Sequence, residues 1–271
     1  MASTEDRARD GGGTAVREGN VVAPADRDVI SVTGPEALSF LQGQLSQDVA
    51  ALAVGARAYS FVLEPTGKVA ALVVVTREGE EAFLLEVEAG FGGAVVDRLN
   101  RFRLRTKATI ELVARRAPAA DADADTVVSE ARRIEQGLPK LGAELIPGET
   151  IPAEAGQWLI DAAVSFTKGC YTGQELVARI DSRGGNVPRH LRGILVDAPA
   201  DALPPVGAEV VVAGKVVGAL TSLAWSPGFG QAVALAMIGR AVEPPVGAEL
   251  RWDGGATSAR ITALPMHPPA S

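Results

Sequence analysis

The chain has 271 residues, of which 47% are hydrophobic, so it can bury a large core in one large domain or in two smaller ones. Its net charge of −7 and its pI near 5.0 argue against a protein that binds nucleic acid or anionic membranes. A single cysteine excludes an internal disulfide framework. It also excludes a zinc or iron–sulfur site built from this chain's thiolates alone, since such sites take about four ligands.

The N-terminal segment and the longest apolar run bear on location. Residues 1–25 alternate charged residues with Gly and Ala and contain no apolar core, so we expect a disordered tail and not a signal peptide. The longest apolar run, residues 69–75, is far shorter than the roughly 18 residues that a membrane-spanning helix needs. Together with the lone cysteine, these features predict a cytoplasmic protein without a membrane partner.

The first half of the chain alternates strand and helix patterns. Residues 28–32 predict a strand, and Thr33-Gly34-Pro35-Glu36 has the spacing of a capping box for the helix that follows. Leu38, Leu41 and Leu45 fall on one face of that helix. This order of antiparallel strands and helices predicts an α+β body. The further elements expected here are a hairpin of residues 59–64 and 68–76, a strand at 81–88, a helix at 92–103 and a strand at 106–113.

Two polar patterns in this half leave their roles open. Glutamines at positions 42, 44 and 47, followed by Asp48, lie near the end of the first helix and either face solvent or line a ligand pocket. Cations gather over residues 98–107 of this otherwise acidic chain. They form either a solvated face or a site for an anion such as phosphate or a polyglutamate tail. This cluster consists of Arg98, Arg101, Arg103, Arg105 and Lys107.

The second half begins after a linker and ends in a repeat. Residues 116–128 are rich in Ala and Asp without periodicity, which predicts a linker inside the body, and a short helix is expected at 130–135. The hexapeptide at residues 204–209 recurs at 244–249, and each copy precedes a strand, a glycine turn and another strand. Short strands between Gly and Pro turns predict a small β-barrel or sandwich. We therefore expect a body over residues 26–187, in two subdomains, and a C-terminal β-barrel over 188–271.

The chain's only cysteine lies in the octapeptide Lys168-Gly169-Cys170-Tyr171-Thr172-Gly173-Gln174-Glu175. Thr172 and Glu175 have capping-box spacing, which predicts a helix from residue 175 to 180. Cys170 would then lie just before a helix N-terminus, where peptide dipoles present partial positive charge, and Lys168 adds a full charge. Both effects favour the thiolate, which is the nucleophilic and metal-binding form. The ordinary alternative for a lone cysteine is a small buried hydrophobe.

Taken with other segments, the octapeptide resembles the signature of YgfZ-type folate-binding proteins. These are relatives of a mitochondrial iron–sulfur assembly factor and paralogues of the T-protein aminomethyltransferase of glycine cleavage. The resemblance covers about residues 28–265. The other similar segments are Thr33-Gly34-Pro35-Glu36-Ala37, Phe40-Leu41-Gln42-Gly43-Gln44-Leu45, Gln47-Asp48-Val49, Gly67-Lys68-Val69, Arg133-Ile134 with Gly137, Pro139, Gly142, Glu144 and Leu145, Leu220-Thr221-Ser222, Ser226-Pro227 and Ala263-Leu264-Pro265.

The resemblance implies a fold and a biological role. The implied fold is α+β: a T-protein-like ring of antiparallel sheets with helices that encloses a central channel, plus a C-terminal β-barrel. The implied cofactor is tetrahydrofolate or a derivative, and the implied role is assembly or repair of iron–sulfur clusters in client enzymes, including tRNA-modifying ones. The expected partners are folate and transiently bound iron–sulfur client or carrier proteins, without direct tRNA binding. No permanently bound metal is expected, although Cys170 could give a cluster one ligand.

The resemblance also implies site residues. Cys170, Lys168 and Tyr171 form the expected catalytic group, in which the lysine and the tyrosine orient or activate the thiol. We expect Arg179 to help hold this loop, together with Gln174 and Glu175. The expected cofactor-binding residues are Gln42, Gln44, Asp48, Arg103, Gly169, Gly173, Gln174 and Glu175.

Two departures from the T-protein keep the reaction open. That enzyme carries an acidic pair after the hairpin glycine, where this chain has Ala70 and Ala71. Alanine can neither take a proton nor stabilise a cation, so aminomethyl transfer is not expected and catalysis itself stays undecided. Residues 114–131 are also too few to include the T-protein's acidic folate anchor. The alternatives are a folate-dependent one-carbon transferase or demethylase, and a binding module that contacts tRNA through the cation cluster.

Overall fold

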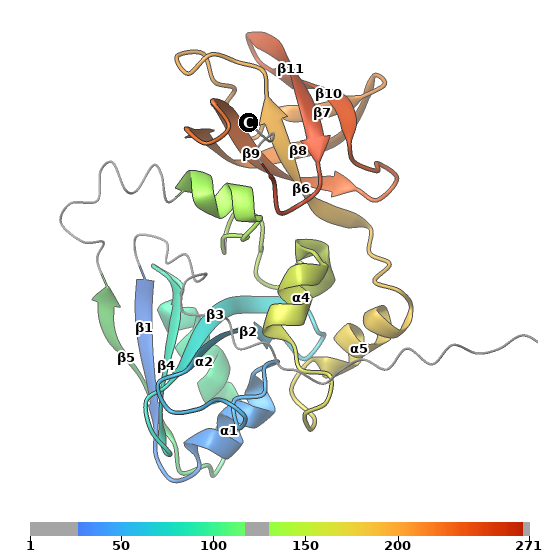
Figure 1. Cartoon of the computed structure of the whole chain (residues 1–271). Coiled ribbons are helices and arrows are strands. Elements are labelled where there is room, and N and C mark those ends of the chain that lie inside the picture. Colours follow the sequence, from blue (N-terminus) through green and yellow to red (C-terminus); the bar gives the residue numbers. More distant parts are fainter. Residues whose placement is uncertain (1–26, 117–129, 268–271) are drawn as a thin grey trace, which may run out of the picture.

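The computed structural model describes residues 27–116 and 130–267, which form an α+β body and a closed β-barrel (Figure 1). The predicted fold class of an α+β body with a C-terminal barrel is confirmed. The expected tail at 1–25 and nearly all of the expected linker at 116–128 lie outside the described residues. Arg116 was assigned to that linker but is the last residue of a strand.

The body is built on one antiparallel sheet in the order β2-β3-β4-β1-β5. The predicted hairpin is confirmed: its two strands are paired in antiparallel register and joined by the turn that ends at Gly67. The last strand starts three residues later than expected, because residues 102–106 form turns and Arg105 has a positive φ of 59°. The strands are β1 (Arg27–Thr33), β2 (Arg57–Leu63), β3 (Val69–Arg77), β4 (Ala82–Glu88) and β5 (Thr109–Arg116).

Helices α1 (Ala37–Gln44) and α2 (Gly92–Arg101) lie against the sheet (Figure 1). The start of α2 is fixed by Asp28 of β1, whose carboxylate accepts hydrogen bonds from Gly90 N at 2.8 Å and Gly92 N at 2.9 Å. The capping box predicted for α1 was wrong, since Glu36 is the N-cap and makes no side-chain cap. Its carboxylate instead accepts a hydrogen bond from the backbone N–H of Lys107 at 2.7 Å. The side chain that was predicted to cap the helix therefore bonds to a loop far away in the sequence.

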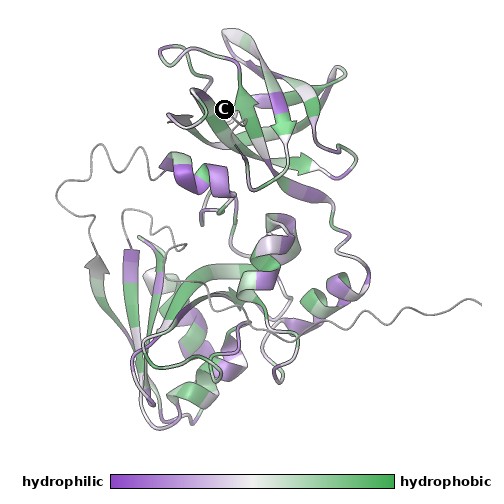
Figure 2. Cartoon of the chain, in the orientation of Figure 1, coloured by the Kyte–Doolittle hydropathy of each residue, from purple (hydrophilic) through white to green (hydrophobic). Residues whose placement is uncertain are grey.

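The middle of the chain forms short helices that lead from the body to the barrel. The helix predicted at 130–135 is present at residues 130–136. It is followed by η1 (Pro152–Ala155), α4 (Gln157–Ala163) and α5 (Gln174–Ser182). In Figure 2 the helical segment at 130–136 is mostly hydrophilic although it lies between the body and the barrel.

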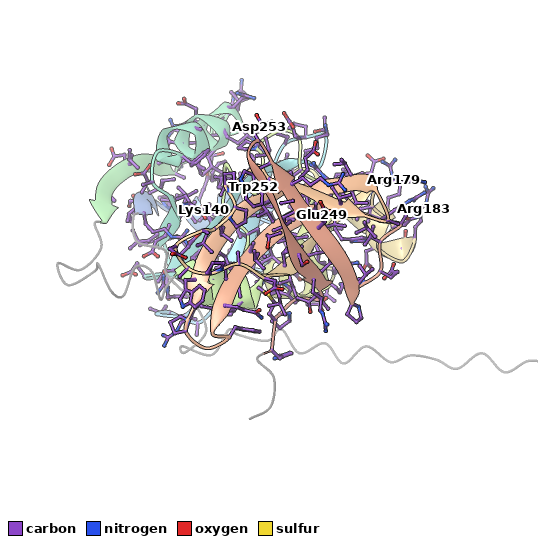
Figure 3. All side chains as sticks on the ribbon, turned by 90° about the horizontal axis from the view of Figure 1, so that it is seen from above. Lys140, Arg179, Arg183, Glu249, Trp252 and Asp253 are labelled. Atoms are coloured by element: carbon purple, nitrogen blue, oxygen red, sulfur yellow. The ribbon has the colours of Figure 1, made fainter. Side chains whose placement is uncertain are left out.

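The barrel closes through strands in the order β10-β11-β6-β9-β8-β7, around aliphatic side chains such as Val210, Leu250 and Ile261. The internal repeat has a structural meaning: its first copy leads into β7 and its second into β10, and these two strands pair. The hairpin between β10 and β11 ends at Trp252 and Asp253, labelled in Figure 3. The strands are β6 (Arg189–Val196), β7 (Glu209–Val212), β8 (Lys215–Ser226), β9 (Gln231–Gly239), β10 (Val246–Trp252) and β11 (Gly255–Thr262).

A buried polar network joins the body to the barrel. Arg133, which is 1% exposed, donates to Ser222 Oγ of β8 at 2.6 Å, to both carboxylate oxygens of Glu130 at 2.7 and 2.9 Å, and to Leu138 O at 2.6 Å. Glu144 accepts from Ser222 Oγ at 2.6 Å and lies 3.4 Å from Arg133 Nη1. Burial alone would lower the pKa of Arg133, but the hydrogen bond and charge of Glu130 and the charge of Glu144 outweigh burial and raise it.

Candidate functional site

Cys170 lies on the loop that connects α4 to α5, and its side chain is exposed. Gly169 beside it is also exposed, whereas Lys168 and Tyr171 on either side are buried. The alternative of a small buried hydrophobe is therefore wrong. The loop presents its thiol to solvent and anchors the flanking side chains in the protein.

Lys168 is the first anchor of this loop. Its ammonium donates to three backbone oxygens around the end of α1: Gln42 O at 2.6 Å, Leu45 O at 2.7 Å and Gln47 O at 3.0 Å. An ammonium has three donors, so this set leaves none for a direct hydrogen bond to Cys170. The Nζ atom also lies 5.1 Å from the centre of the Tyr171 ring. Burial lowers the pKa of Lys168 to about 8, against the opposing charge of Asp48.

Thr172 is the second anchor, and its position corrects the predicted capping box. Helix α5 starts at Gln174, and its N-cap is Gly173 in the left-handed conformation, without a side-chain cap. Thr172 instead donates its N–H to Gly43 O at 3.0 Å and its hydroxyl to Gln44 Oε1 at 3.4 Å, both on α1. Cys170 therefore lies before the first helical turn, and the field of a helix dipole falls off within that turn.

Two glycines let this loop touch the β2–β3 hairpin. Gly173 and Gly67 both have φ of +82°, and a Cβ on Gly173 would come within 2.6 Å of Glu64 O and 2.8 Å of Leu63 Cβ. A Cβ on Gly67 would lie 2.4 Å from Leu176 Cβ of α5. Neither position has room for a side chain, so two segments of the resemblance, far apart in sequence, meet here.

Replacing Gly173 with alanine should therefore destabilise the protein by about 1–3 kcal/mol, since the residue needs both a left-handed φ and the absence of a Cβ. Chemical denaturation measures the change. Gly148→Ala is the matched control: this glycine has φ of +76°, but nothing lies within 4 Å of its ideal Cβ. An equal loss in both variants would mean that the close approach to the hairpin contributes nothing.

The expected folate-binding residues at the end of α1 have partners within the protein. Gln42 accepts the N–H of Val49 at 3.0 Å and donates to Asp48 Oδ1 at 2.8 Å, so its amide shapes the turn after α1. Arg103, farther along the chain, donates to Ala108 O at 2.7 Å. Gln42 and Gln44 thus neither simply face solvent nor line a pocket. Their side chains bond to other parts of the protein: Gln42 to the turn after α1, and Gln44 to Thr172 of the cysteine loop. Their role as folate ligands stays a prediction.

Several charged residues in and just after α5 point outward. Glu175 is exposed, and Arg179 of α5 and Arg183, which follows the helix as its C-cap, lie at the edge of the molecule (Figure 3). Within the described ranges, the Arg179 side chain makes no hydrogen bond or ion pair, so it does not hold the cysteine loop as expected.

Sequence reasoning missed the position of Arg98. Among the five residues of the cation cluster, Arg98 alone is buried, at 3% exposure, while the others face solvent. It stacks over Phe102 at 4.2 Å and donates to Gln44 Oε1 at 3.2 Å. The signal was present: Val95, Arg98, Leu99 and Phe102 have the i, i+3, i+4, i+7 spacing of a buried helix face.

A groove of about 480 Å³ separates the body from the barrel. Phe91 and Lys140 line it from the body, and Thr221, Ser222 and Leu223 line it from β8. Its size is within the roughly 300–1,000 Å³ of small-molecule sites, and Phe91 and Lys140 give it an aromatic ring and a cation. The hydroxyls of Thr221 and Ser222 already bond to protein groups. None of the folate-binding residues expected from the sequence lines this groove.

Two features are absent from the described residues. In residues 27–116 and 130–267 no group of three or more His, Cys, Asp or Glu side chains could hold a metal ion. No helix in those ranges is long and apolar enough to cross a membrane.

Family models match both parts of the chain. The model described as GCVT N-terminal domain matches residues 25–119, which contain the body sheet. The model described as Glycine cleavage T-protein C-terminal barrel domain matches residues 189–267, which contain the barrel.

Curated relatives are similar at modest identity. An uncharacterized protein of Haemophilus influenzae is 30% identical over 189 residues, covering 58% of this chain and 67% of that protein. The mitochondrial iron–sulfur cluster assembly factor IBA57 homolog of Phaeosphaeria nodorum is 27% identical over 211 residues, covering 58% and 51%. The tRNA-modifying protein YgfZ of Pectobacterium carotovorum is 27% identical over 220 residues, covering 59% and 66%. The chain thus spans about half to two thirds of the length of these relatives.

A solved structure shares the fold. The crystal structure of the glycine cleavage system aminomethyltransferase T from Bartonella henselae has a TM-score of 0.70, covering 90% of this chain and 87% of that chain. The two sequences are 17% identical, so the likeness shows a common architecture and not a common activity.

Proposed function

Since this chain belongs to the glycine cleavage T-protein family, we propose that it is a folate-dependent factor in the assembly or repair of iron–sulfur clusters in client enzymes. The observation that carries the proposal is the presentation of Cys170, an exposed thiol on a loop whose flanking Lys168 and Tyr171 are buried. A cytoplasmic location is part of the same proposal. The relatives named as an iron–sulfur cluster assembly factor and as a tRNA-modifying protein support the choice of clients.

The thiol would act together with groups from another molecule. One thiolate can give a cluster a single ligand, and the described residues contain no group of three or more His, Cys, Asp or Glu side chains that could hold a metal ion. The other ligands would come from the client, from a carrier protein or from a small thiol. A transient covalent or redox adduct at the thiol is the other use of such an exposed group. In either case Lys168 and Thr172 keep Cys170 at the surface, where a partner can reach it.

For tetrahydrofolate or a derivative we propose the groove between the body and the barrel, in place of the residues near α1 that the resemblance implied. The groove has the size for such a ligand, whereas the polar atoms of Gln42 and Arg103 already hold protein groups. Phe91 offers a ring against which a planar heterocycle can pack, and Lys140 offers a cation for a carboxylate. Bound folate would supply a one-carbon carrier beside residues that orient it.

Aminomethyl transfer is the second candidate function, and the match of both parts of the chain to T-protein family models favours it. The residues at the hairpin oppose it. Ala70 is half-buried and Ala71 is buried in β3, so neither position supplies a proton acceptor. The assay is formation of methylene-tetrahydrofolate from tetrahydrofolate and methylated amines, followed by mass spectrometry. Turnover would establish this function, and its absence across the donors would remove it.

The test of the main proposal is rescue of a host that lacks its own relative of this protein. We expect an iron–sulfur enzyme of that host to lose activity on deletion and to regain it with the wild-type chain. Cys170→Ser should leave the activity at the level of the deletion, because a hydroxyl does not replace a thiolate as ligand or nucleophile. The amount of client protein is measured in parallel.

Thr167→Ser is the matched control, since it changes an exposed residue of the same loop and keeps the thiol. It should rescue as the wild type does. Full rescue by Cys170→Ser would refute a role of the thiol, and no rescue by the wild type would refute the iron–sulfur function.

A further inference from the structure

We propose that Arg98 is a positioning residue for Cys170: from the core of the body it fixes, through Gln44, the loop that carries the thiol. This inference rests on the proposed function of Cys170, since it matters only if the loop acts. It gives one member of the cation cluster a role that neither an exposed solvated face nor a tRNA surface would require.

Arg98 is held by groups from three elements. Its Nη1 donates to Gln44 Oε1 of α1 at 3.2 Å, and its Nη2 donates to Leu63 O at the end of β2. The guanidinium lies over the ring of Phe102 at 4.2 Å. Its Nε is buried without a hydrogen-bond partner, 3.7 Å from Glu64 Oε2. The planar fork thus ties the end of α1 to the hairpin of β2 and β3.

Two partners of Arg98, the side chain of Gln44 and the backbone at the end of β2, also contact the cysteine loop. Gln44 Oε1 accepts from Arg98 and also from the hydroxyl of Thr172, two residues after Cys170. Leu63 and Glu64 form the wall against which Gly173 packs without room for a Cβ. Arg98 therefore holds the side-chain amide of Gln44, to which Thr172 of the loop bonds. It also holds the backbone of the hairpin, against which Gly173 packs.

Stability does not account for a cation in this position. A buried guanidinium carries a large desolvation cost, and here one N–H stays unpartnered while the carboxylate of Glu64, 3.7 Å away, is partly exposed. Burial lowers the pKa of Arg98, against the charge of Glu64 and with that of Arg101. An apolar side chain would fill the site at less cost. Unlike an apolar side chain, the guanidinium donates hydrogen bonds in fixed directions. We therefore infer that Arg98 serves to position the groups that it bonds.

The single cysteine allows a direct test. A nitroxide attached to Cys170 in the full chain reports the order of the loop in its electron paramagnetic resonance spectrum. Arg98→Met, Gln44→Met and Thr172→Val each break the connection at a different atom, and each should shift the spectrum toward a mobile component. Arg101→Met is the matched control: it lies on the same helix, is exposed and makes no hydrogen bond or ion pair in the described chain, so its spectrum should match the wild type.

Spectra of Gln44→Met and Thr172→Val that superimpose on the wild type would overturn the inference, even if Arg98→Met does not fold. A shift in Arg101→Met equal to that in Arg98→Met would also overturn it, because a general loosening of α2 would then suffice. The spectra need neither folate nor a client enzyme. Rescue by Cys170→Ser would therefore remove the proposed function and leave the connection from Arg98 to the loop to be decided by the spectra.

Discussion

Arg133→Met is expected to lower the free energy of unfolding by about 3–5 kcal/mol, the typical loss when one partner of a buried ion pair is removed. The arginine is 1% exposed and bridges the body to β8 of the barrel through Ser222. Without it, Glu144 keeps its buried charge and loses its nearest cation, which lies 3.4 Å away. Chemical denaturation followed by circular dichroism measures the loss, and separate transitions for body and barrel would show that the junction has come apart.

The exposed pair of Arg251 and Glu249 on β10 is the control, and Glu249 is labelled in Figure 3. These side chains are about half exposed and lie 2.7 Å apart, so Arg251→Met should leave stability unchanged within experimental error. A loss in Arg133→Met no larger than in Arg251→Met would contradict the role of the network. The double variant Arg133→Met with Glu144→Leu should lose less than Arg133→Met alone, since it leaves no unpaired buried charge.

Lys168→Met is expected to lower the free energy of unfolding by about 2–4 kcal/mol, because three backbone oxygens at the end of α1 lose a charged donor at once. Methionine keeps most of the side-chain volume, so the loss reports the hydrogen bonds more than the packing. Lys140→Met is the control: its side chain is exposed, and it should be close to neutral. An equally small effect in both variants would mean that the three hydrogen bonds of Lys168 add nothing.

The same lysine predicts a pH dependence with a definite sign. The unfolded chain keeps the proton of Lys168 up to its ordinary pKa of 10.5, while the folded protein releases it near pH 8. Between these values the unfolded state binds more protons, so the stability of the wild type should rise with pH relative to Lys168→Met. Below about pH 8 the difference should stay constant. Measuring both proteins across this window cancels the other titrating groups, and a difference that shrinks toward pH 10 would disprove the shift.

Local pattern was sufficient where an element needs only its own residues. The hairpin was predicted from two β-rich runs around Pro65-Thr66-Gly67, and the paired strands β2 and β3 are present there. The repeated hexapeptide predicted matching strands, which are β7 and β10. Period and turn chemistry are written in neighbouring residues, so they can be recognised without the rest of the fold.

Local pattern failed where a polar side chain had a choice of partner. Both predicted capping boxes were wrong, because Glu36 bonds to the loop at Lys107 and Thr172 bonds to Gly43 and Gln44. In each case a group from another element competes with the cap, and a spacing rule does not include it.

By itself, the sequence determined the α+β body, the barrel, the family resemblance and the segment that carries Cys170. Only the tertiary structure decided that Lys168 bonds to the end of α1, 126 residues from Gln42, and that Arg98 lies inside the body beneath the loop. The spacing of apolar residues predicts which face of a helix is buried. It does not predict which group a charged residue on that face will bond to. The partner depends on which backbone groups folding leaves unpaired nearby, and those groups come from distant parts of the chain.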